Sequence, residues 1–148
     1  MFLVDTDVIS ATAPTKASPR QDVLDWLRDR GDKVFLSTIT LTELRRGIAL
    51  LAGKGHHRKA RLLEAWEDQL AQSFATRILP VDEAVARLAG DLFGRAEAKG
   101  YFPGLADACI AATAERYRLT VISANAKHFR VLGATYHPLW TDTERGPS

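Results

Sequence analysis

The sequence predicts an α/β fold in which a parallel β-sheet is covered by helices on both faces. Four short runs of apolar or β-branched residues are typical of buried strands, and they lie at residues 2–4, 34–36, 77–81 and 119–123. The longer segments between these runs carry apolar residues three and four positions apart, which is the spacing of a buried stripe on a helix. Helices that alternate with strands in this way connect the parallel strands of a single sheet.

Each predicted helix is defined by its own apolar residues. Four segments have the helical spacing, and their stripes are Val23, Leu24 and Leu27; Leu41, Leu44, Ile48 and Leu51; Leu63, Trp66 and Leu70; and Val85, Leu88 and Leu92. A fifth helix is predicted over residues 105–117, because this segment is rich in alanine, a strong helix former whose small side chain allows close packing.

The composition is that of one soluble globular domain. The chain has 148 residues, of which 46% are apolar and 26% are charged, and a chain of this length buries a sizeable core without disulfides. Its single cysteine, Cys109, excludes internal disulfides and zinc-finger scaffolds. There is no basic leader and no apolar stretch of the roughly 20 residues that span a bilayer, so we expect a cytoplasmic protein without a membrane segment. We expect one domain over residues 1–140 and a loose tail over 141–148.

Four oxygen-bearing side chains are placed where the carboxyl ends of the predicted strands meet. Asp5 directly follows the first strand, Glu43 lies near the start of the helix after the second, Asp107 lies in the first turn of the alanine-rich helix, and Asn125 follows the last strand. Carboxylates that converge in a cleft repel one another, so such a group persists mainly around a hard cation. Oxygen ligands without a His or Cys cluster favour Mg²⁺ or Mn²⁺, and the chemistry this suggests is hydrolytic phosphoryl transfer.

Each of these residues also has a purely structural interpretation. Residues 40–43 match a capping box, in which Glu43 bonds back to the backbone of Thr40. Asp107 would also favour the positive end of its helix dipole, and Asn125 is common in turns. Asp7 is interpreted as a helix N-cap that orients Asp5. For Asp5 we favour the functional interpretation, because burying an unpaired carboxylate at the end of a strand costs free energy.

Four segments of the chain, 2–10, 36–47, 105–114 and 120–129, resemble in order the motifs of the PIN-domain ribonucleases. The match is with the VapC-type toxins of type II toxin–antitoxin systems, including the FitB-like branch. This resemblance implies a three-layer α/β/α sandwich with a central parallel sheet of four to five strands. It also implies that Asp5, Glu43 and Asp107 form the catalytic, metal-binding triad, and that Asn125 fills the fourth catalytic position.

The same resemblance implies an activity and its partners. Such proteins use Mg²⁺ or Mn²⁺ to hydrolyse RNA, with tRNA or another structured RNA as the expected substrate. They form homodimers and are held inactive by a VapB-type antitoxin, whose tail inserts an Arg into the acidic pocket. The stripe that contains Trp66, if partly exposed, would form a groove for a second copy of the chain or for the antitoxin. This sequence departs from many members at His128, where an Asp commonly precedes the Phe, and at Asp7, where Asn is frequent.

Two other functions remain open from the sequence. Residues 4–8 also resemble the first motif of haloacid-dehalogenase-like phosphatases, in which the first Asp, here Asp5, is a phosphorylated nucleophile. That family needs a further pair of acids just after a strand, whereas Asp107 stands alone. The second alternative is a PIN-like RNA-binding module without turnover, which the presence of His128 and Asn125 makes conceivable.

A basic segment predicts where RNA would bind. The formal net charge is only +2, yet between Glu43 and Glu64 there are six basic residues and no acidic one. Arg45 and Arg46 lie nearest to Glu43 and are predicted to hold RNA phosphates, and Lys127 and His128 are predicted to extend the basic rim on the other side. The structural interpretation of the same segment is a solvated helical hairpin with long basic side chains.

Overall fold

The computed structural model describes residues 1–138, which are built around a five-stranded parallel sheet. The strand order is β3-β2-β1-β4-β5, and every neighbouring pair runs parallel. The strands are β1 (Phe2–Val4), β2 (Val34–Ser37), β3 (Ile78–Leu79), β4 (Thr120–Ser123) and β5 (Tyr136–Pro138). Because β1 is the central strand and pairs with both β2 and β4, the residue that follows it lies at the middle of the sheet edge.

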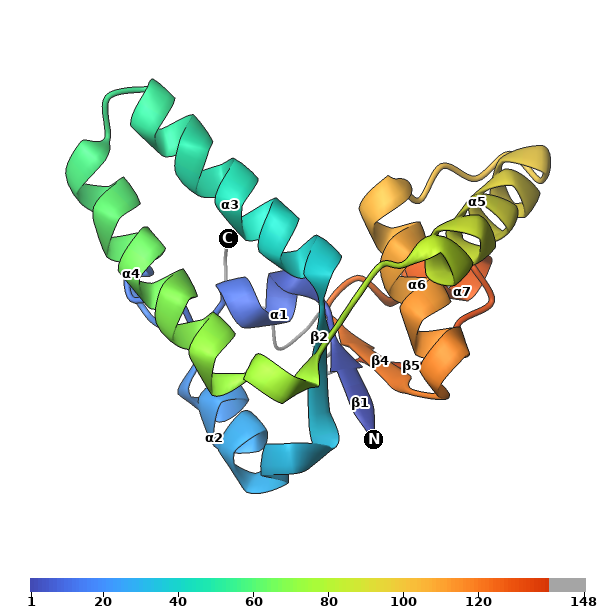
Figure 1. Cartoon of the computed structure of the whole chain (residues 1–148), viewed down its shortest axis with the longest axis horizontal. Helices are drawn as coiled ribbons and strands as arrows, with labels where there is room; N and C mark the ends of the chain where they lie inside the picture. Colours follow the sequence, from blue (N-terminus) through green and yellow to red (C-terminus); the bar gives the residue numbers. More distant parts are fainter. Residues whose placement is uncertain (139–148) are drawn as a thin grey trace.

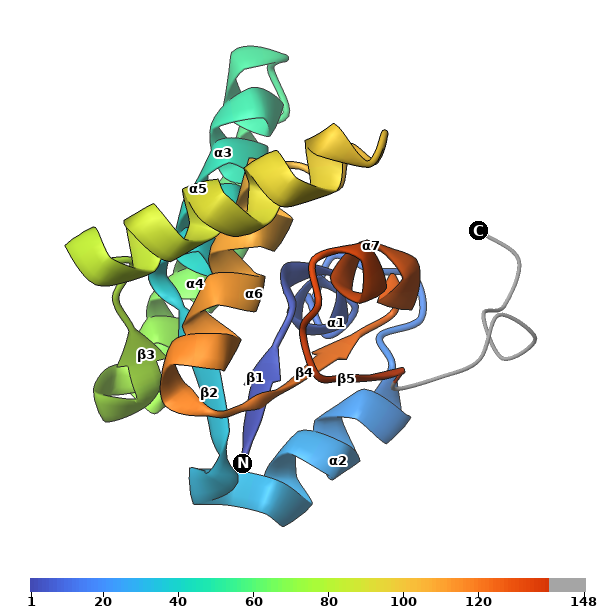
Figure 2. The same ribbon diagram turned by 90° about the vertical axis from the view of Figure 1, so that its right-hand side faces the viewer.

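Helices cover both faces of this sheet (Figures 1 and 2). They are α1 (Thr6–Ser10), α2 (Gln21–Arg30), α3 (Thr38–Gly53), α4 (His57–Ser73), α5 (Glu83–Ala98), α6 (Leu105–Tyr117) and α7 (Ala126–Val131). In Figure 1 the hairpin of α3 and α4 and the pair formed by α5 and α6 diverge like the arms of a V above the sheet. Among residues 1–138, no helix is both long enough and apolar enough to cross a membrane.

The strand side chains alternate between two hydrophobic cores, as expected for a sheet that is buried on both faces. Leu3 and Val121 point to the core that α5, α6 and α7 cover. Val4 and Ile122 point to the opposite core, which contains residues of α1, α2 and α3. The predicted three-layer α/β/α fold is therefore confirmed.

Short elements account for most differences from the sequence prediction. The third strand was predicted over residues 77–81 but spans only Ile78–Leu79, because a 3₁₀ turn (Ala75–Arg77) precedes it and Pro80 has no N–H to continue the ladder. Helices α1 and α7 have five and six residues, too few to show a periodic apolar stripe. The predicted tail and the domain boundary at residue 140 lie outside the described residues.

Candidate active site

Asp5 lies at the carboxyl end of the central strand, with its carboxylate buried. Its backbone N–H donates to the carbonyl of Ile122 at 2.9 Å, which extends the contact between β1 and β4. One carboxylate oxygen accepts from the backbone N–H of Thr6 at 2.7 Å, and the other accepts from Ser123 Oγ at 2.8 Å. The side chain is therefore fixed at both oxygens.

Burial raises the pKa of the Asp5 carboxyl well above its ordinary value. The charge of Asp7 raises this pKa further, and that of Asp107 adds to it, while the hydrogen bonds from Ser123 and Thr6 oppose the rise. Asp5 thus lies close enough to two other acids to be repelled by them. A cation at this point would relieve both the burial cost and the repulsion.

The predicted N-cap role of Asp7 is wrong, because Asp5 caps α1. Asp7 lies in the first turn of that helix, and its Oδ2 accepts from the backbone N–H of Ala124 at 3.2 Å. This bond ties α1 to the loop after β4. The sequence could not separate the two acids, because both Asp5 and Asp7 are favourable helix starters.

The capping-box interpretation of Glu43 is also wrong. Helix α3 begins earlier than predicted, and Ser37 is its N-cap, with Oγ accepting from the backbone N–H of Ile39 at 3.2 Å. Glu43 therefore lies in the second turn of α3. Its Oε1 accepts from Thr6 Oγ1 at 2.6 Å, so a hydroxyl next to Asp5 holds this glutamate at the sheet edge.

Asp107 lies in the first turn of α6, as predicted. Gly104 precedes that helix with a φ of 102°, a conformation that side-chain-bearing residues rarely adopt. The Oδ2 atom of Asp107 is 2.7 Å from His128 Nδ1, and the same ring nitrogen is 3.0 Å from the side-chain amide nitrogen of Asn125. Burial raises the pKa of Asp107, and the contact with His128 opposes that rise.

One continuous network of polar contacts connects the four predicted catalytic residues. It runs in order through Glu43, Thr6, Asp5, Ser123, Asn125, His128 and Asp107. The Ser123–Asn125 link is a 2.8 Å bond from the backbone N–H of Asn125 to Ser123 Oγ. The charge of Glu43 also raises the pKa of Cys109 on α6, after the larger effect of burial. Glu43 therefore lies near enough to α6 to influence its side chains, in agreement with the packing of α3 against α6.

We call these seven residues the acidic cluster. Thr6, Ser123 and His128 belong to it, although the sequence analysis did not predict that they would hold the acids in place. Thr6 and Ser123 are the polar residues next to Asp5 and at the end of β4, and that position was the available signal. His128 was predicted to bind RNA at the rim. The structure instead directs its Nδ1 to Asp107.

Arg45, which was predicted to hold RNA phosphates, is paired with acids of the neighbouring helix. The Arg45 guanidinium contacts three acids of α4, at 2.9 Å from Glu64, 2.9 Å from Glu67 and 2.8 Å from Asp68. Two helical positions turn a side chain by about 200°, so Arg45 projects from α3 on the side opposite Glu43.

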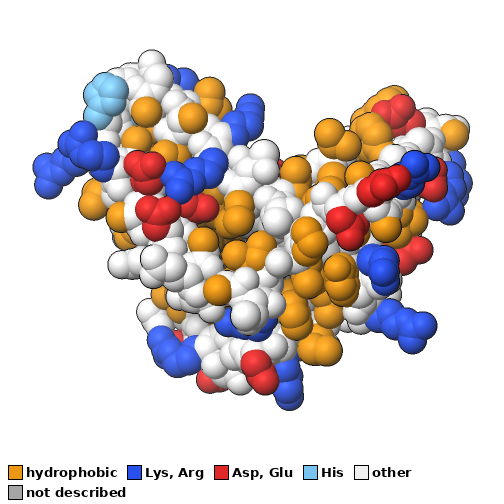
Figure 3. All heavy atoms as spheres, viewed as in Figure 1, with side chains coloured by type: hydrophobic (Ala, Val, Ile, Leu, Met, Phe, Trp, Pro, Cys, Tyr) orange, Lys and Arg blue, Asp and Glu red, His pale blue; other side chains and the backbone are white. Residues whose placement is uncertain are grey.

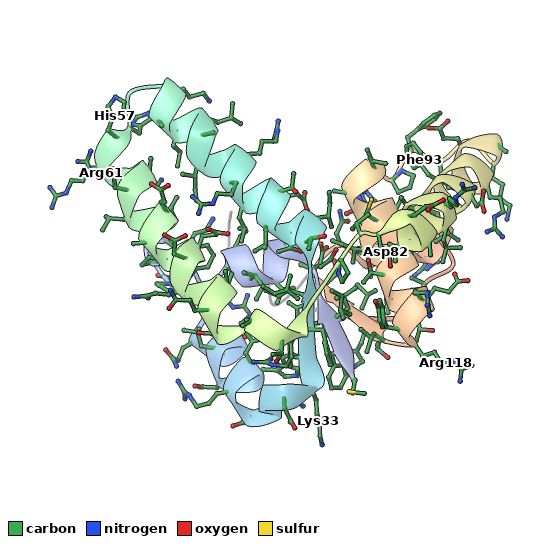
Figure 4. All side chains as sticks on the ribbon, in the orientation of Figure 1. Lys33, His57, Arg61, Asp82, Phe93 and Arg118 are labelled. Carbon is green, nitrogen blue, oxygen red and sulfur yellow. The ribbon has the colours of Figure 1, made fainter. Side chains whose placement is uncertain are left out.

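The remaining basic residues of the α3–α4 hairpin are exposed, and so is Lys127 on α7. Arg46 lies one turn beyond Glu43 on α3, and Lys127 lies in the first turn of α7. Figure 4 shows His57 and Arg61 projecting from the outer end of the α3–α4 hairpin, and Figure 3 shows Lys and Arg side chains gathered there. The predicted basic segment therefore reaches from the helix turn after Glu43 to the outer end of the hairpin.

A family model described as PIN domain matches residues 2–134. The chain belongs to the PIN-domain family. It is 38% identical over 144 residues to "Toxin FitB" of Neisseria gonorrhoeae, which covers 96% of this chain and 100% of the relative. It is 35% identical over 135 residues to "VapC ribonuclease Y4jK" of Sinorhizobium fredii, covering 90% of this chain and 93% of the relative.

A solved structure gives the same assignment for the fold. The chain superposes on a structure described as FitAcB from Neisseria gonorrhoeae with a TM-score of 0.79 and 36% identity, covering 93% of this chain and 97% of that one. The relatives of this PIN domain thus include proteins named as a toxin and as a ribonuclease.

The donor atoms of this PIN domain suit a hard divalent cation, although its acids are not gathered around one point. Within residues 1–138, no three His, Cys, Asp or Glu side chains form a ready group for a metal ion. The carboxylates of Glu43 and Asp107 instead contact Thr6 and His128. All the acids nevertheless offer oxygen ligands, and a cation would offset both the burial of the Asp5 carboxylate and the charges of Asp7 and Asp107, which together raise the pKa of Asp5.

A groove of about 240 Å³ opens beside the acidic cluster, between α1, α3 and α4. Thr6 and Glu43 line it together with an apolar wall, which includes Leu44, Ile48, Leu63 and Trp66. Trp66 is half-buried, so its apolar stripe is partly exposed. The groove of this PIN domain therefore joins an apolar surface to a carboxylate.

Proposed function

We propose that this PIN domain is a Mg²⁺- or Mn²⁺-dependent endoribonuclease and the toxin of a toxin–antitoxin pair. The observation that carries the proposal is the buried carboxylate of Asp5, which is repelled by Asp7 and Asp107. Polar contacts connect it through Thr6 to Glu43, and through Ser123, Asn125 and His128 to Asp107. The names of its relatives support the same reaction and the same biological role.

In this proposal, Asp5, Glu43 and Asp107 hold the cation, and Asn125 completes the catalytic group. The bound ion would supply the Lewis acid for hydrolysis of an RNA phosphodiester by water. Ser123 and the backbone N–H of Thr6 keep the Asp5 carboxylate in one orientation, and the Thr6 hydroxyl holds Glu43. These contacts orient Asp5 and Glu43 before substrate arrives, and preorganised charge of this kind favours electrostatic catalysis.

The Asp107→Asn variant is expected to cleave structured RNA about 10²- to 10³-fold more slowly than wild type, because it removes charge that must hold the cation. EDTA should stop cleavage by wild type, and Mn²⁺ or Mg²⁺ should restore it. The matched control is Asp91→Asn, which changes an exposed acid on α5 and should leave cleavage unchanged. The measurement is the rate of product formation from purified tRNA.

Other outcomes of that assay would favour the alternatives. RNA binding without cleavage in any metal would indicate a non-catalytic module. Transfer of labelled phosphate from a small phosphomonoester to Asp5 would indicate the phosphatase reaction. Cleavage that persists in EDTA and in Asp107→Asn would contradict the proposed metal-dependent mechanism.

Four residues, Arg45, Arg46, Lys127 and His128, were predicted to bind RNA. Of these, we propose that Arg46 and Lys127 contact the RNA phosphates. Both are exposed on helices that carry members of the acidic cluster. Replacing either with Ala, in the Asp107→Asn background, should weaken RNA binding and lower the slope of log affinity against log salt by about 0.7 for single-stranded RNA. Arg61→Ala, at the outer end of the hairpin, is the control (Figure 4). Equal slopes in all variants would contradict this assignment.

The proposed inhibitor is a VapB-type antitoxin. The groove between α1, α3 and α4 would accept the apolar face of an antitoxin segment, and Glu43 at its end would attract an Arg. We also propose a homodimer in the cytoplasm, for which Phe102 and Leu105, 76% and 66% exposed, supply apolar surface next to the start of α6.

A further inference from the structure

His128 lies between two predicted catalytic residues. Its Nδ1 is 2.7 Å from Asp107 Oδ2 and 3.0 Å from the side-chain amide nitrogen of Asn125. The side chains of His128 and Asp107 are only 32% and 21% exposed, so solvent competes weakly for this contact. The next residue, Phe129, is fully buried and anchors α7 in the core, which fixes the position from which the His128 ring projects.

The contact also connects elements that are distant in sequence. Asp107 is on α6, whereas Asn125 precedes α7 and its backbone N–H donates to Ser123 Oγ at the end of β4. Ser123 in turn donates to Asp5. The His128 ring is therefore the link through which the acid of α6 is held to the strand end that fixes Asp5.

We propose that His128 is a positioning residue that fixes Asp107 for cation binding, an inference that rests on the proposed function. By holding Oδ2 of Asp107, the ring leaves Oδ1 of that carboxylate for the cation and prevents the side chain from rotating. A carboxylate that binds a cation is ionised and can only accept, so we assign the proton of this 2.7 Å contact to Nδ1, with the ring as donor. This assignment requires the Asn125 amide, whose nitrogen is placed 3.0 Å from Nδ1, to be turned over so that its oxygen faces the ring, since one Nδ1 cannot both donate and accept.

This geometry determines which substitutions preserve the role. The Nδ2 atom of asparagine occupies nearly the place of the histidine Nδ1, so His128→Asn keeps a donor toward Asp107. Glutamine carries its amide nitrogen farther out, near the place of Nε2, so His128→Gln moves the donor away from Asp107. His128→Leu keeps similar bulk without any donor.

Isothermal titration with Mn²⁺ tests this assignment on the metal-free full chain. His128→Asn should bind Mn²⁺ within about threefold of wild type, whereas His128→Gln and His128→Leu should bind at least tenfold more weakly, the loss typical of partners that orient metal ligands. His57→Leu, at the far end of the α3–α4 hairpin, is the control and should bind like wild type (Figure 4). Nitrogen-15 NMR of the metal-free protein should show the proton of His128 on Nδ1, and circular dichroism confirms that each variant is folded.

The outcomes separate this inference from the proposed function. Equal Mn²⁺ affinity in His128→Leu and wild type, or equal affinity in His128→Gln and His128→Asn, would overturn the positioning role even if RNA is cleaved. The expected order of affinities without any RNA cleavage would support the positioning role and contradict the ribonuclease. A wild-type protein that binds no Mn²⁺ would overturn both.

Discussion

The Asp5→Asn variant is expected to lose RNA cleavage and, at the same time, to be more stable than wild type in the absence of metal. Asparagine keeps an oxygen that can accept from the Thr6 backbone N–H and an amide that can bond with Ser123, so the helix cap survives. It removes a buried negative charge that Asp7 and Asp107 repel. Cleavage should fall by about 10²- to 10³-fold, while the free energy of unfolding should rise.

The stability difference should depend on pH in a defined direction. The pKa of Asp5 is raised in the folded protein, so the folded state binds the Asp5 proton more tightly than the unfolded chain does. The charged carboxylate therefore destabilises metal-free wild type at pH values above the raised pKa. This destabilisation disappears as the pH falls toward the ordinary value for aspartate, near 4. The advantage of Asp5→Asn should accordingly be greatest at neutral pH and should shrink on acidification.

Thermal unfolding in EDTA between pH 5 and 8 measures this effect. An increase of roughly 2–4 °C in Tm per kcal/mol is expected for a chain of this size. Asp91→Asn serves as the control, because it removes an exposed charge of the same type. A lower Tm for Asp5→Asn than for wild type at neutral pH would show that the Asp5 charge stabilises the fold, contrary to this interpretation.

The Arg45→Ala variant should lose about 2 kcal/mol of stability, because it leaves a buried carboxylate without its cation. Glu67 is 3% exposed, and the Arg45 guanidinium lies 2.9 Å from its Oε2. Breaking a fully buried ion pair from one side costs about 3–5 kcal/mol. The loss here should be smaller because the Arg45 side chain is 45% exposed. The measurement is urea unfolding followed by circular dichroism.

A second substitution distinguishes this structural role from the predicted binding of RNA. Glu67→Leu removes the buried charge, so adding it to Arg45→Ala should restore most of the lost stability. If the double variant is stable and cleaves RNA at the wild-type rate, Arg45 acts on the fold alone. If it is stable but binds RNA more weakly, the predicted phosphate contact of Arg45 is supported. Wild-type stability in Arg45→Ala would contradict the importance of the ion pair.

The sequence predicted the elements whose patterns are local. The alanine-rich helix over residues 105–117 and the first strand have the predicted bounds. In both segments, the local residue preferences and the burial of apolar side chains favour the same element. The start of α3 was misplaced because Ser37 and residues 40–43 both resemble helix starts, and only the end of β2 decides between them. The direction of Arg45 follows from helical geometry relative to Glu43, so the sequence did contain that information.

The site depends on contacts that no local pattern contains. Thr6 and Glu43 are 37 residues apart, and Ser123 and Asp5 are 118 apart, so their hydrogen bonds exist only after the sheet has formed. The position of His128 over Asp107 depends likewise on α7, a helix too short for periodicity to predict. The acidic residues themselves were predictable because each lies near a strand end or a helix start. The polar groups that orient them were not.

The most direct test of the central claim combines a Mn²⁺ titration of the metal-free protein with RNA cleavage by the same preparation. If the acids around Asp5 bind the ion that drives hydrolysis, the Mn²⁺ concentration giving half-maximal cleavage should equal the Kd measured by calorimetry under identical conditions. Asp107→Asn should raise both values together. Cleavage at the full rate in EDTA, or Mn²⁺ binding that saturates without any change in cleavage, would contradict the account.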